Sequence, residues 1–315
     1  MKFSDIALKV LAAKESGLIK TNAEFWSKCP NRREFDEKIC KAPGFSMTHE
    51  RLYDAYSDND SDIGIICAFD EDFPYINPKV KNKGDKPFLI FYKGDYSLLS
   101  DLNKNVAVIG SINPEEKIQK REREIVKRLV KNDLIIVSGL AAGCDSIAHR
   151  VAVNTGGKTI AILPSSISKV YPAGHRAFAE GIIEKGGLLI SEYYKEPTSR
   201  SESLKHFIER DRLQAMFSKV VILIASYRKG EGDSGSRHAM EAAKKYGIER
   251  FAMFNQKTDS KNPQFGLNRD YLSENVDNRT KVLKTGSIDY ITALHNPNLD
   301  SSHTSSECGQ LGFKI

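Results

Sequence analysis

The stretch VAVIGSINPEE, residues 106–116, decides the fold class of this chain. Its first four residues are apolar and mostly β-branched, which favours a buried strand. The strand pattern stops at Gly110-Ser111, and a charged segment typical of a helix follows Pro114. A strand that turns into a helix at a glycine directs backbone N–H groups toward the turn, and such turns often hold an anion. The stretch therefore predicts a parallel sheet and raises the question of which anion it binds.

The same alternation of apolar runs and helical patterns continues to about residue 254. Continuous apolar strands indicate a parallel sheet covered on both faces, and right-handed crossovers make such a sheet doubly wound. We therefore expect an α/β fold, a doubly wound and mostly parallel Rossmann-like sheet with a small helical N-terminal domain. The predicted strands are 106–110, 134–139, 158–163, 187–192, 219–226 and 249–254, and the predicted helices are 114–132, 145–155, 175–185, 204–216 and 235–246.

Upstream of this core the pattern is different. Short helical segments precede an acidic stretch, and two further strand patterns, 62–69 and 86–95, lead into the core. The predicted division is a helical N-terminal domain (1–60), connecting strands (61–105), a Rossmann-like domain (106–295) and a polar, Ser-rich tail expected to be disordered (296–315).

Composition narrows the class of ligand. The net charge is +6; residues 1–105 carry 16 Lys and Arg against 17 Asp and Glu, and residues 106–315 carry 31 against 24. The positive excess lies in the predicted sheet domain, which suits a polyanionic ligand. No apolar run approaches the length of a membrane span, so we expect no membrane association. Five cysteines without paired spacing predict free thiols in a reducing cytoplasm and no structural zinc.

Small residues and hydroxyls recur where the predicted strands end. In a parallel sheet these ends share one edge, where ligands bind. One glycine-rich turn also opens the helix predicted at 235–246 and exposes further N–H groups. The candidate phosphate-binding residues of these exits are Gly110, Ser111, Ser138, Gly139, Ser165, Ser234, Gly235 and Ser236.

Motifs that would give the site a different chemistry are missing from the sequence. The first turn lacks G-x-G-x-x-G, and there is no G-x-x-x-x-G-K-[ST], no H-E-x-x-H and no G-x-S-x-G. We therefore expect no catalytic residues, no metal and no cofactor. His149, on the helix predicted at 145–155, is interpreted as a packing residue that contacts the loop before it.

The segment FIERDRL, residues 207–213, offers two further cations. Arg210 and Arg212 do not share a helix face, so one is expected to reach a phosphate while the other pairs with Asp211 or a neighbouring acid. Apolar residues frame the segment, which argues against a simple solvated charge run.

Taken in order, these segments resemble the DNA-processing protein A (DprA/Smf) family, a branch of the Rossmann-like SLOG superfamily. The resemblance covers residues 62–255, and SGLAAGCDSIAH and GGLLISEY are its most specific stretches. It rests on DEDFPYINPKV, FLIFYKGD, VAVIGSINP, SGLAAGCDSIAH, GGKTIAILPSSISKVYP, GGLLISEY, FIERDRL and DSGSRHAMEAAKKYG.

The resemblance implies a function. The family's Rossmann-like domain binds single-stranded DNA in a positively charged pocket and helps to load a RecA-like recombinase during transformation, without chemistry on the DNA. Carried over, Gly110 and Ser111 lie at the phosphate pocket, Arg210 and Arg212 contact the DNA backbone, and Phe207 lies near a base. A homodimer is a further expectation.

Two departures from the family pattern bear on the site. The family commonly has G-S-R where this chain has Gly110-Ser111-Ile112, and its R-N-R becomes Arg210-Asp211-Arg212. An expected arginine is missing at the first position, and a carboxylate is added at the second.

Three hypotheses stay open at this stage. The first is a single-stranded DNA-binding protein acting in DNA uptake, recombination or foreign-DNA handling. The second is a nucleotide sensor or nucleotide-processing enzyme of the same superfamily; against catalysis, the glutamate position of the related phosphoribohydrolase motif falls on Ala239, with Glu241 on another helix face. The third is an interaction protein with a vestigial pocket, supported by Ile112 and Asp211.

Overall fold

The computed structural model describes residues 3–57, 62–232, 235–274 and 280–295. The predicted tail, 296–315, and Ser234 lie outside these residues. Within the described part the strands are β1 (Gly64–Cys67), β2 (Leu89–Gly94), β3 (Asn105–Ile109), β4 (Ile135–Ser138), β5 (Thr159–Ile162), β6 (Leu188–Ser191), β7 (Val220–Leu223), β8 (Glu249–Ala252) and β9 (Lys281–Val282). The α-helices are α1 (Asp5–Glu15), α2 (Asn22–Lys28), α3 (Arg32–Lys38), α4 (Phe45–Ser57), α5 (Glu116–Lys131), α6 (Cys144–Asn154), α7 (Arg176–Glu184), α8 (Arg200–Met216), α9 (Ser236–Tyr246), α10 (Gln256–Asp259), α11 (Gly266–Ser273) and α12 (Thr285–His295).

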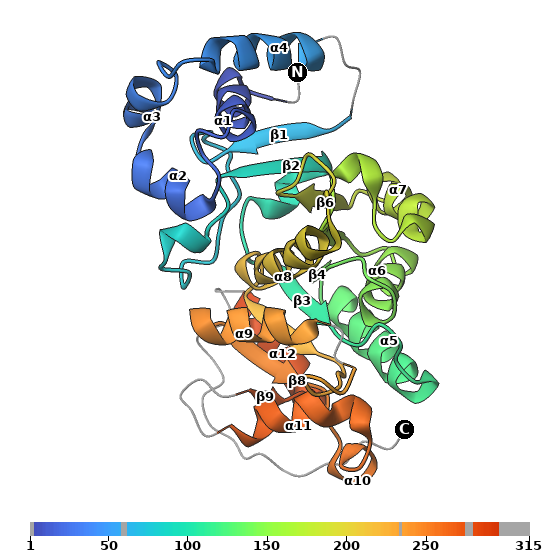
Figure 1. The fold of residues 1–315 in the computed structure, drawn as a ribbon. Helices are drawn as coiled ribbons and strands as arrows, with labels where there is room; N and C mark the ends of the chain where they lie inside the picture. Colours follow the sequence, from blue (N-terminus) through green and yellow to red (C-terminus); the bar gives the residue numbers. More distant parts are fainter. Residues whose placement is uncertain (1–2, 58–61, 233–234, 275–279, 296–315) are drawn as a thin grey trace.

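The strands of the described part form one sheet in the order β1-β2-β6-β5-β4-β3-β7-β8-β9 (Figure 1). The ladders from β6 to β9 are parallel, whereas β2 pairs antiparallel with β6, and β1 with β2. The chain therefore adds β4, β5 and β6 on one side of β3, then crosses back and adds β7, β8 and β9 on the other side. This confirms the predicted doubly wound, mostly parallel sheet, and it places the switch point between β3 and β7.

Both faces of the central strands are buried, which explains their continuous apolar sequences. In β3, Val106 and Val108 belong to a core that includes α5, α6 and α12. Their neighbours Ala107 and Ile109 belong to a second core that includes α8, α9 and α11. Successive side chains of a strand point to opposite faces, so each strand contributes to both cores.

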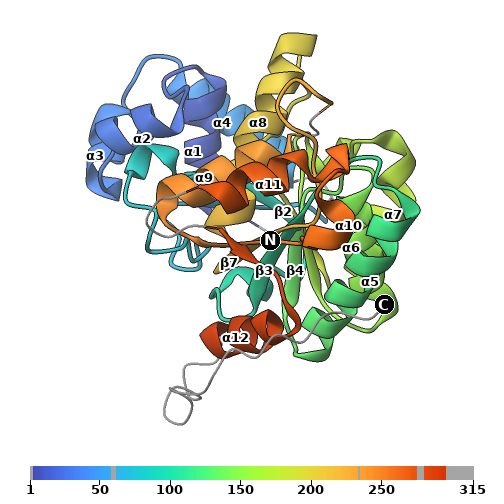
Figure 2. The same cartoon turned by 90° about the horizontal axis from the view of Figure 1, so that it is seen from below.

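Helix α8 carries the chain from β6 back to β7 across the sheet. It begins at Arg200, four residues before the predicted start, because Ser199 caps it: the Ser199 hydroxyl accepts from the Glu202 N–H at 3.1 Å. This spacing is that of a capping box. Seen from below, α8 extends past the neighbouring helices (Figure 2). Its first half is therefore exposed, and its second half packs against the sheet and α9.

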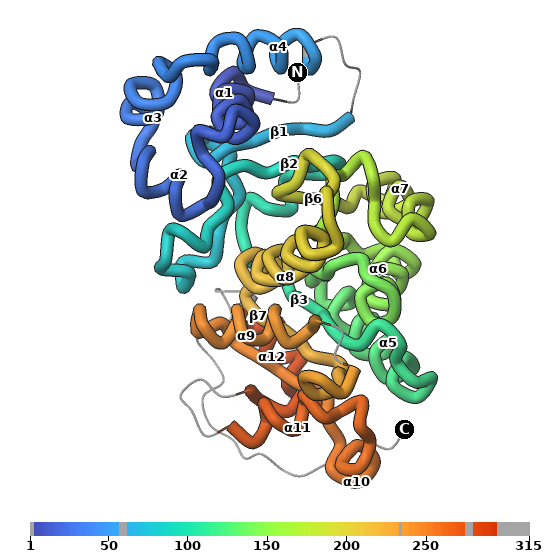
Figure 3. The backbone as a smooth tube through the Cα atoms, viewed as in Figure 1, coloured from blue at the N-terminus to red at the C-terminus, as the bar shows by residue number. Residues whose placement is uncertain are grey.

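The N-terminal helices extend the fold at the β1 edge. Helix α1 packs on β1 and α4, and its buried residues join a third core with β1, β2 and α7. The blue N-terminal helices and the orange-red α10 and α11 consequently lie at opposite ends of the molecule (Figure 3). No helix of the described residues is long and apolar enough to cross a membrane.

Candidate nucleic-acid interface

Hydrogen bonds join the residues that follow β3 to those that follow β7 at the switch point. The Ser111 N–H donates to the carbonyl of Ala225 at 2.7 Å, and the Ser236 hydroxyl donates to the carbonyl of Gly110 at 2.8 Å. A Cβ on Gly110 would lie 2.6 Å from the Cys144 sulfur, so only glycine lets α6 approach this turn. Gly110, Ser111 and Ser236 thus lie at the ends of β3 and β7, where Ser236 bonds to the backbone of Gly110 and Ser111 bonds to the backbone of Ala225.

The polar groups at the carboxyl end of β4 also have hydrogen-bond partners within the protein. The Ser138 hydroxyl donates to Val108 of β3 at 2.7 Å. The carboxylate of Asp145, at the start of α6, accepts from the N–H groups of Gly139 at 3.1 Å and Ala141 at 3.4 Å. Burial raises the pKa of Asp145, and the charge of Arg210 opposes that rise. The amide of Gly139, which is predicted to face a bound anion, and that of Ala141 therefore already face a carboxylate of the protein.

Arg210 lies beneath this edge and differs from its predicted role. Its side chain is 4% exposed, and Nη1 donates to the carbonyls of Gly139 and, at 2.7 Å, Ile162. Nε lies 3.0 Å from a carboxylate oxygen of Asp211. A Cβ on Gly139 would lie only 1.8 Å from Nη1. The guanidinium thus joins the ends of β4 and β5 and lies against buried carboxylates, and a phosphate contact by Arg210 stays a prediction that these internal partners weigh against.

Asp211 lies next to the loop that opens α9. Its Oδ2 is 3.5 Å from the position of a Cβ on Gly235, whose φ of +86° is the left-handed conformation that favours glycine. Gln214 donates to Oδ1 at 3.0 Å. Burial raises the pKa of Asp211 to about 7, and the charge of Arg210 opposes the rise. The carboxyl that replaces the family's asparagine is therefore buried and easily protonated.

Arg212 points away from this edge, as expected for a residue on another helix face. Its Nη1 and Nη2 each lie 2.8 Å from a carboxylate oxygen of Glu192, and Nε donates to the carbonyl of Asp85 at 2.9 Å. Lys14 of α1 donates to the carbonyl of Glu192 at 3.1 Å. Burial would lower the pKa of Arg212, but Glu192 raises it overall. Arg212 thus forms a largely buried ion pair that links α8 to the N-terminal helices, and the DNA contact expected of it stays a prediction.

Ser165 and His149 are also internal. Ser165 is 4% exposed, and its carbonyl accepts from the hydroxyl of Ser191 at 2.7 Å. His149 is fully buried, and its Nδ1 lies 2.6 Å from the hydroxyl of Thr159. Burial lowers the pKa of His149 to about 3. His149 is thus the packing residue that was expected, although its partner lies on β5 instead of the preceding loop.

Phe207 belongs to a group of apolar side chains that reach solvent. Its ring meets that of Tyr171 edge to face, with centroids 5.4 Å apart. Tyr171 is 55% exposed, and on the same helix as Phe207 the side chains of Leu204 and Ile208 are 60% and 39% exposed. Ile112, at the β3 exit, is 53% exposed. We call Ile112, Tyr171, Leu204, Phe207 and Ile208 the exposed layer of the site.

Sequence reasoning missed Tyr171, because the loop after β5 has no periodic pattern. The available signal was an aromatic residue a few positions beyond a strand exit. Exposed cations lie on the same two segments as the aromatic pair. Lys169 precedes Tyr171 in the same loop, and Arg200 and Lys205 lie on α8 with Phe207. Lys205 lies 3.6 Å from Glu209, an exposed pair of small energetic weight.

Metal chemistry has no support in the part of the chain that the structure describes. No group of three or more His, Cys, Asp or Glu side chains there could hold a metal ion. The cysteines among these residues, Cys29, Cys40, Cys67 and Cys144, are free.

Comparison with known proteins identifies the family. The family model described as DNA recombination-mediator protein A matches residues 64–274, two thirds of the chain. This chain belongs to that family. The match spans β1 to α11, so it contains all of the strand exits described above.

Individual proteins of this DNA recombination-mediator protein A family are also similar to the chain. Protein Smf of Borreliella burgdorferi is 35% identical over 46% of this chain and 45% of its own length. The chain spans about half the length of the curated relatives it matches. The X-ray structure of DNA processing protein A from Streptococcus pneumoniae matches with a TM-score of 0.66 and 25% identity, covering 94% of this chain and 99% of that one.

A second solved structure supports the fold alone. DNA processing protein A of Helicobacter pylori, a protein that binds single-stranded DNA, matches with a TM-score of 0.57 and 24% identity. The match covers 78% of this chain and 99% of that chain.

Proposed function

We propose that this protein binds single-stranded DNA at the exposed layer, with bases against Tyr171 and Phe207 and phosphates near the surrounding cations. The observation that carries the proposal is the aromatic pair of exposed Tyr171 and half-buried Phe207 at the carboxyl edge of a sheet of this family. Aromatic side chains stack on any base, so they give affinity without sequence preference. The Helicobacter pylori relative, which binds single-stranded DNA, adds support.

The buried charges beneath this layer favour bases over phosphates at its centre. Arg210 and Arg212 both have carboxylate partners, so neither is free to neutralise a phosphate. Backbone phosphates would instead meet exposed side chains such as Arg200 and Lys205. Binding of this kind weakens with salt, since each neutralised phosphate releases counterions.

The nucleotide-processing alternative gains no support from α9. Ala239, at the position of the motif's glutamate, is fully buried. Glu241 accepts a hydrogen bond from the Tyr271 hydroxyl of α11 at 2.7 Å. The nearest glutamate therefore faces α11, and the absence of enzymatic chemistry stays a prediction.

The test is fluorescence anisotropy with a labelled oligo-dT of about 30 nucleotides, several times the site size of a single-stranded DNA-binding fold. We expect salt-sensitive binding that duplex DNA and free nucleotides displace poorly. Tyr171→Ala and Phe207→Ala should each weaken binding by about 1–3 kcal/mol, the contribution of one stacked base.

Tyr53→Ala is the matched control, because Tyr53 of α4 is 42% exposed and distant in the sequence from the strand exits. It should bind like the wild type. Absence of oligo-dT binding by the wild type would overturn the proposal, and displacement by a free nucleotide would favour the sensor hypothesis.

Family membership also supports the finer proposal that the protein acts in DNA uptake, recombination or foreign-DNA handling and passes the strand to a RecA-like recombinase. Faster assembly of recombinase filaments on protein-coated DNA would support this role. The predicted homodimer is checked separately by sedimentation of the free protein.

A further inference from the structure

Helix α5 carries much of the positive charge of the chain. Its 16 residues include seven Lys or Arg and three Glu, in a chain whose net charge is +6. One of the three, Glu122, is fully buried, and burial raises its pKa well above the ordinary value. The outward surface of α5 is therefore more basic than its sequence alone suggests.

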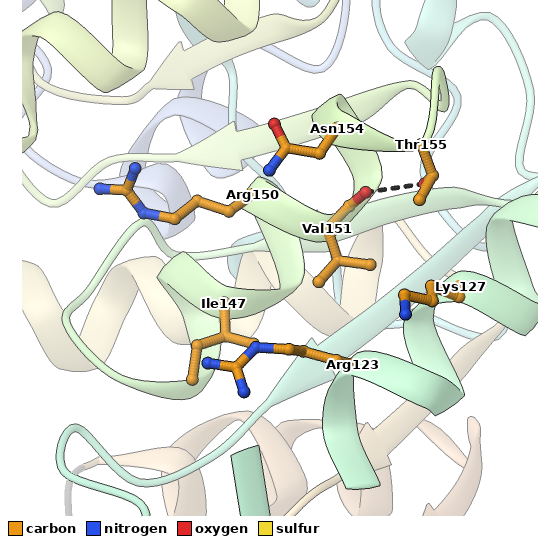
Figure 4. Close-up of a pocket in the computed structure, with 7 residues that line it drawn as sticks. All are labelled: Arg123, Lys127, Ile147, Arg150, Val151, Asn154 and Thr155. Carbon is orange, nitrogen blue, oxygen red and sulfur yellow. Dashed lines mark hydrogen bonds between the residues drawn. The ribbon is translucent and has the colours of Figure 1, made fainter. Parts of the chain in front are cut away.

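A groove runs between α5 and the adjacent α6 (Figure 4). Its volume is about 290 Å³, and three cations line it, Arg123 and Lys127 from α5 and Arg150 from α6. Ile147 and Val151 contribute an apolar surface, and no carboxylate is among the lining residues that the structure describes. In Figure 4 the side chains of Arg123 and Arg150 extend in the same direction from their two helices.

The cations of the groove keep most of their charge available. Nη2 of Arg123 donates to the neutral amide of Gln119 at 3.0 Å. The guanidinium of Arg150 lies 4.2 Å from the centroid of the Phe178 ring, which orients it without neutralising it. Lys127 pairs with Glu124 at 2.9 Å, but both side chains are about half exposed, and such pairs contribute little.

The two helices that form the groove begin at the edge that carries Ile112 of the exposed layer, since a Cβ on Gly143, the residue before α6, would lie 2.5 Å from the carbonyl of Ile112. Helices α5 and α6 both begin just after strand exits, and Arg150 comes six residues after Cys144, about 9 Å along α6 at 1.5 Å per residue. A strand that leaves the exposed layer along these helices would meet the groove cations next.

We infer that the α5–α6 groove is a second binding site for the phosphodiester backbone of single-stranded DNA, an inference that rests on the proposed function. Bases would contact the exposed layer, and the phosphates of the outgoing strand would lie between Arg123, Lys127 and Arg150. The groove lengthens the stretch of DNA that the protein binds and increases the salt dependence of binding, and it adds no sequence preference.

The experiment compares two oligo-dT lengths on the full chain, about 6 and about 30 nucleotides, near and beyond the size of one binding site. Lys127→Gln/Arg150→Gln should leave binding of the short oligonucleotide unchanged. It should weaken binding of the long one and reduce its salt slope by about 1.4, since each phosphate contact on a single strand contributes about 0.7. The control, Arg33→Gln/Lys41→Gln, removes one Arg and one Lys from exposed positions in and just after α3 and should change neither.

The outcomes separate the two proposals. No binding of either oligonucleotide by the wild type would defeat the proposed function itself. Tight wild-type binding of the long oligonucleotide with an unchanged slope in the groove variant would overturn only this inference, and would leave the groove to another anionic partner, such as an acidic protein. Equal losses for both lengths would also overturn it, because the groove would then be the primary site. Melting temperatures of both variants check that the fold is intact.

Discussion

The carboxyl edge of the sheet has two layers that differ in what their residues do. The polar side chains of the buried layer, made of Ser111, Ser138, Gly139, Asp145, Arg210 and Asp211, contact one another and the backbone of neighbouring strands. The exposed layer, made of Ile112, Tyr171, Leu204, Phe207 and Ile208, leaves large apolar surfaces in water. Charged motif residues thus bind one another within the edge, while the apolar residues of the exposed layer are the ones that the proposed function assigns to the ligand.

The charge balance of the buried layer argues against phosphate binding there. One guanidinium, Arg210, serves two nearby carboxylates, Asp145 and Asp211. Buried charges are tolerated only when paired and hydrogen-bonded. A phosphate brought to Arg210 would compete with both carboxylates and would add negative charge to a site that already has an excess of it.

The strongest test of this comparison is Arg210→Ala. Removal of the guanidinium leaves two buried carboxylates and the carbonyls of Gly139 and Ile162 without their partner. Loss of one member of a buried ion pair costs about 3–5 kcal/mol. We expect that loss in the free energy of unfolding measured by urea denaturation.

The matched control is Arg200→Ala at the exposed start of α8, which should change stability by no more than about 0.5 kcal/mol. If Arg210→Ala kept wild-type stability and lost DNA binding, Arg210 would belong to the ligand site, and the distinction between the layers would fail.

A second test uses the pH dependence of the buried layer. Burial raises the pKa of Asp211 to about 7 in the folded protein, whereas an unfolded aspartate titrates near 4. The folded state therefore binds the proton more tightly, so this residue makes stability fall as pH rises from about 4 to about 7, by at most about 1.4 kcal/mol per pH unit. Asp211→Asn should remove this slope.

Urea unfolding at pH 5, 6, 7 and 8 measures the difference. The advantage of the wild type over the variant should shrink toward pH 7 and then stay constant. Asp133→Asn, at a side chain that is 82% exposed, controls for the loss of one carboxyl. A wild-type advantage that grows with pH would mean that Asp211 is stabilised as the anion, which contradicts the assignment.

The difference between the layers also marks what the sequence can predict. Apolar periodicity located the six strands from β3 to β8 and the helices between them, because each buried strand needs a continuous apolar run. It did not predict β9 or α12, whose segments are short and mixed in character. Helix phase showed that Arg210 and Arg212 diverge, but it could not show that Glu192 and Asp145 lie within their reach.

Motif resemblance found the edge but not the direction of its side chains. Gly110 and Ser236 come together as predicted. Whether an N–H at the edge is free depends on residues such as Asp145, whose carboxylate reaches the N–H groups of Gly139 and Ala141 only because of the conformation of the turn between them. Tyr171 escaped notice because its exposure and its contact with Phe207 are set by loop conformation, which has no sequence period.

The smallest expected effect concerns Ile112, the member of the exposed layer that replaces the family's arginine. Its side chain is 53% exposed, so an arginine there can extend into solvent without displacing the core. Unlike Arg210, such an arginine would stand outside the buried layer and would keep its charge for a phosphate. Ile112→Arg should tighten oligo-dT binding a few-fold and steepen the salt slope by about 0.7, the value for one added contact on a single strand.

Ile112→Gln, which has a similar polar reach without the charge, is the control and should leave the slope unchanged. If the arginine variant binds no better than the glutamine variant, the strand does not pass the β3 exit, and the bases at Tyr171 and Phe207 must be approached from the α8 side alone.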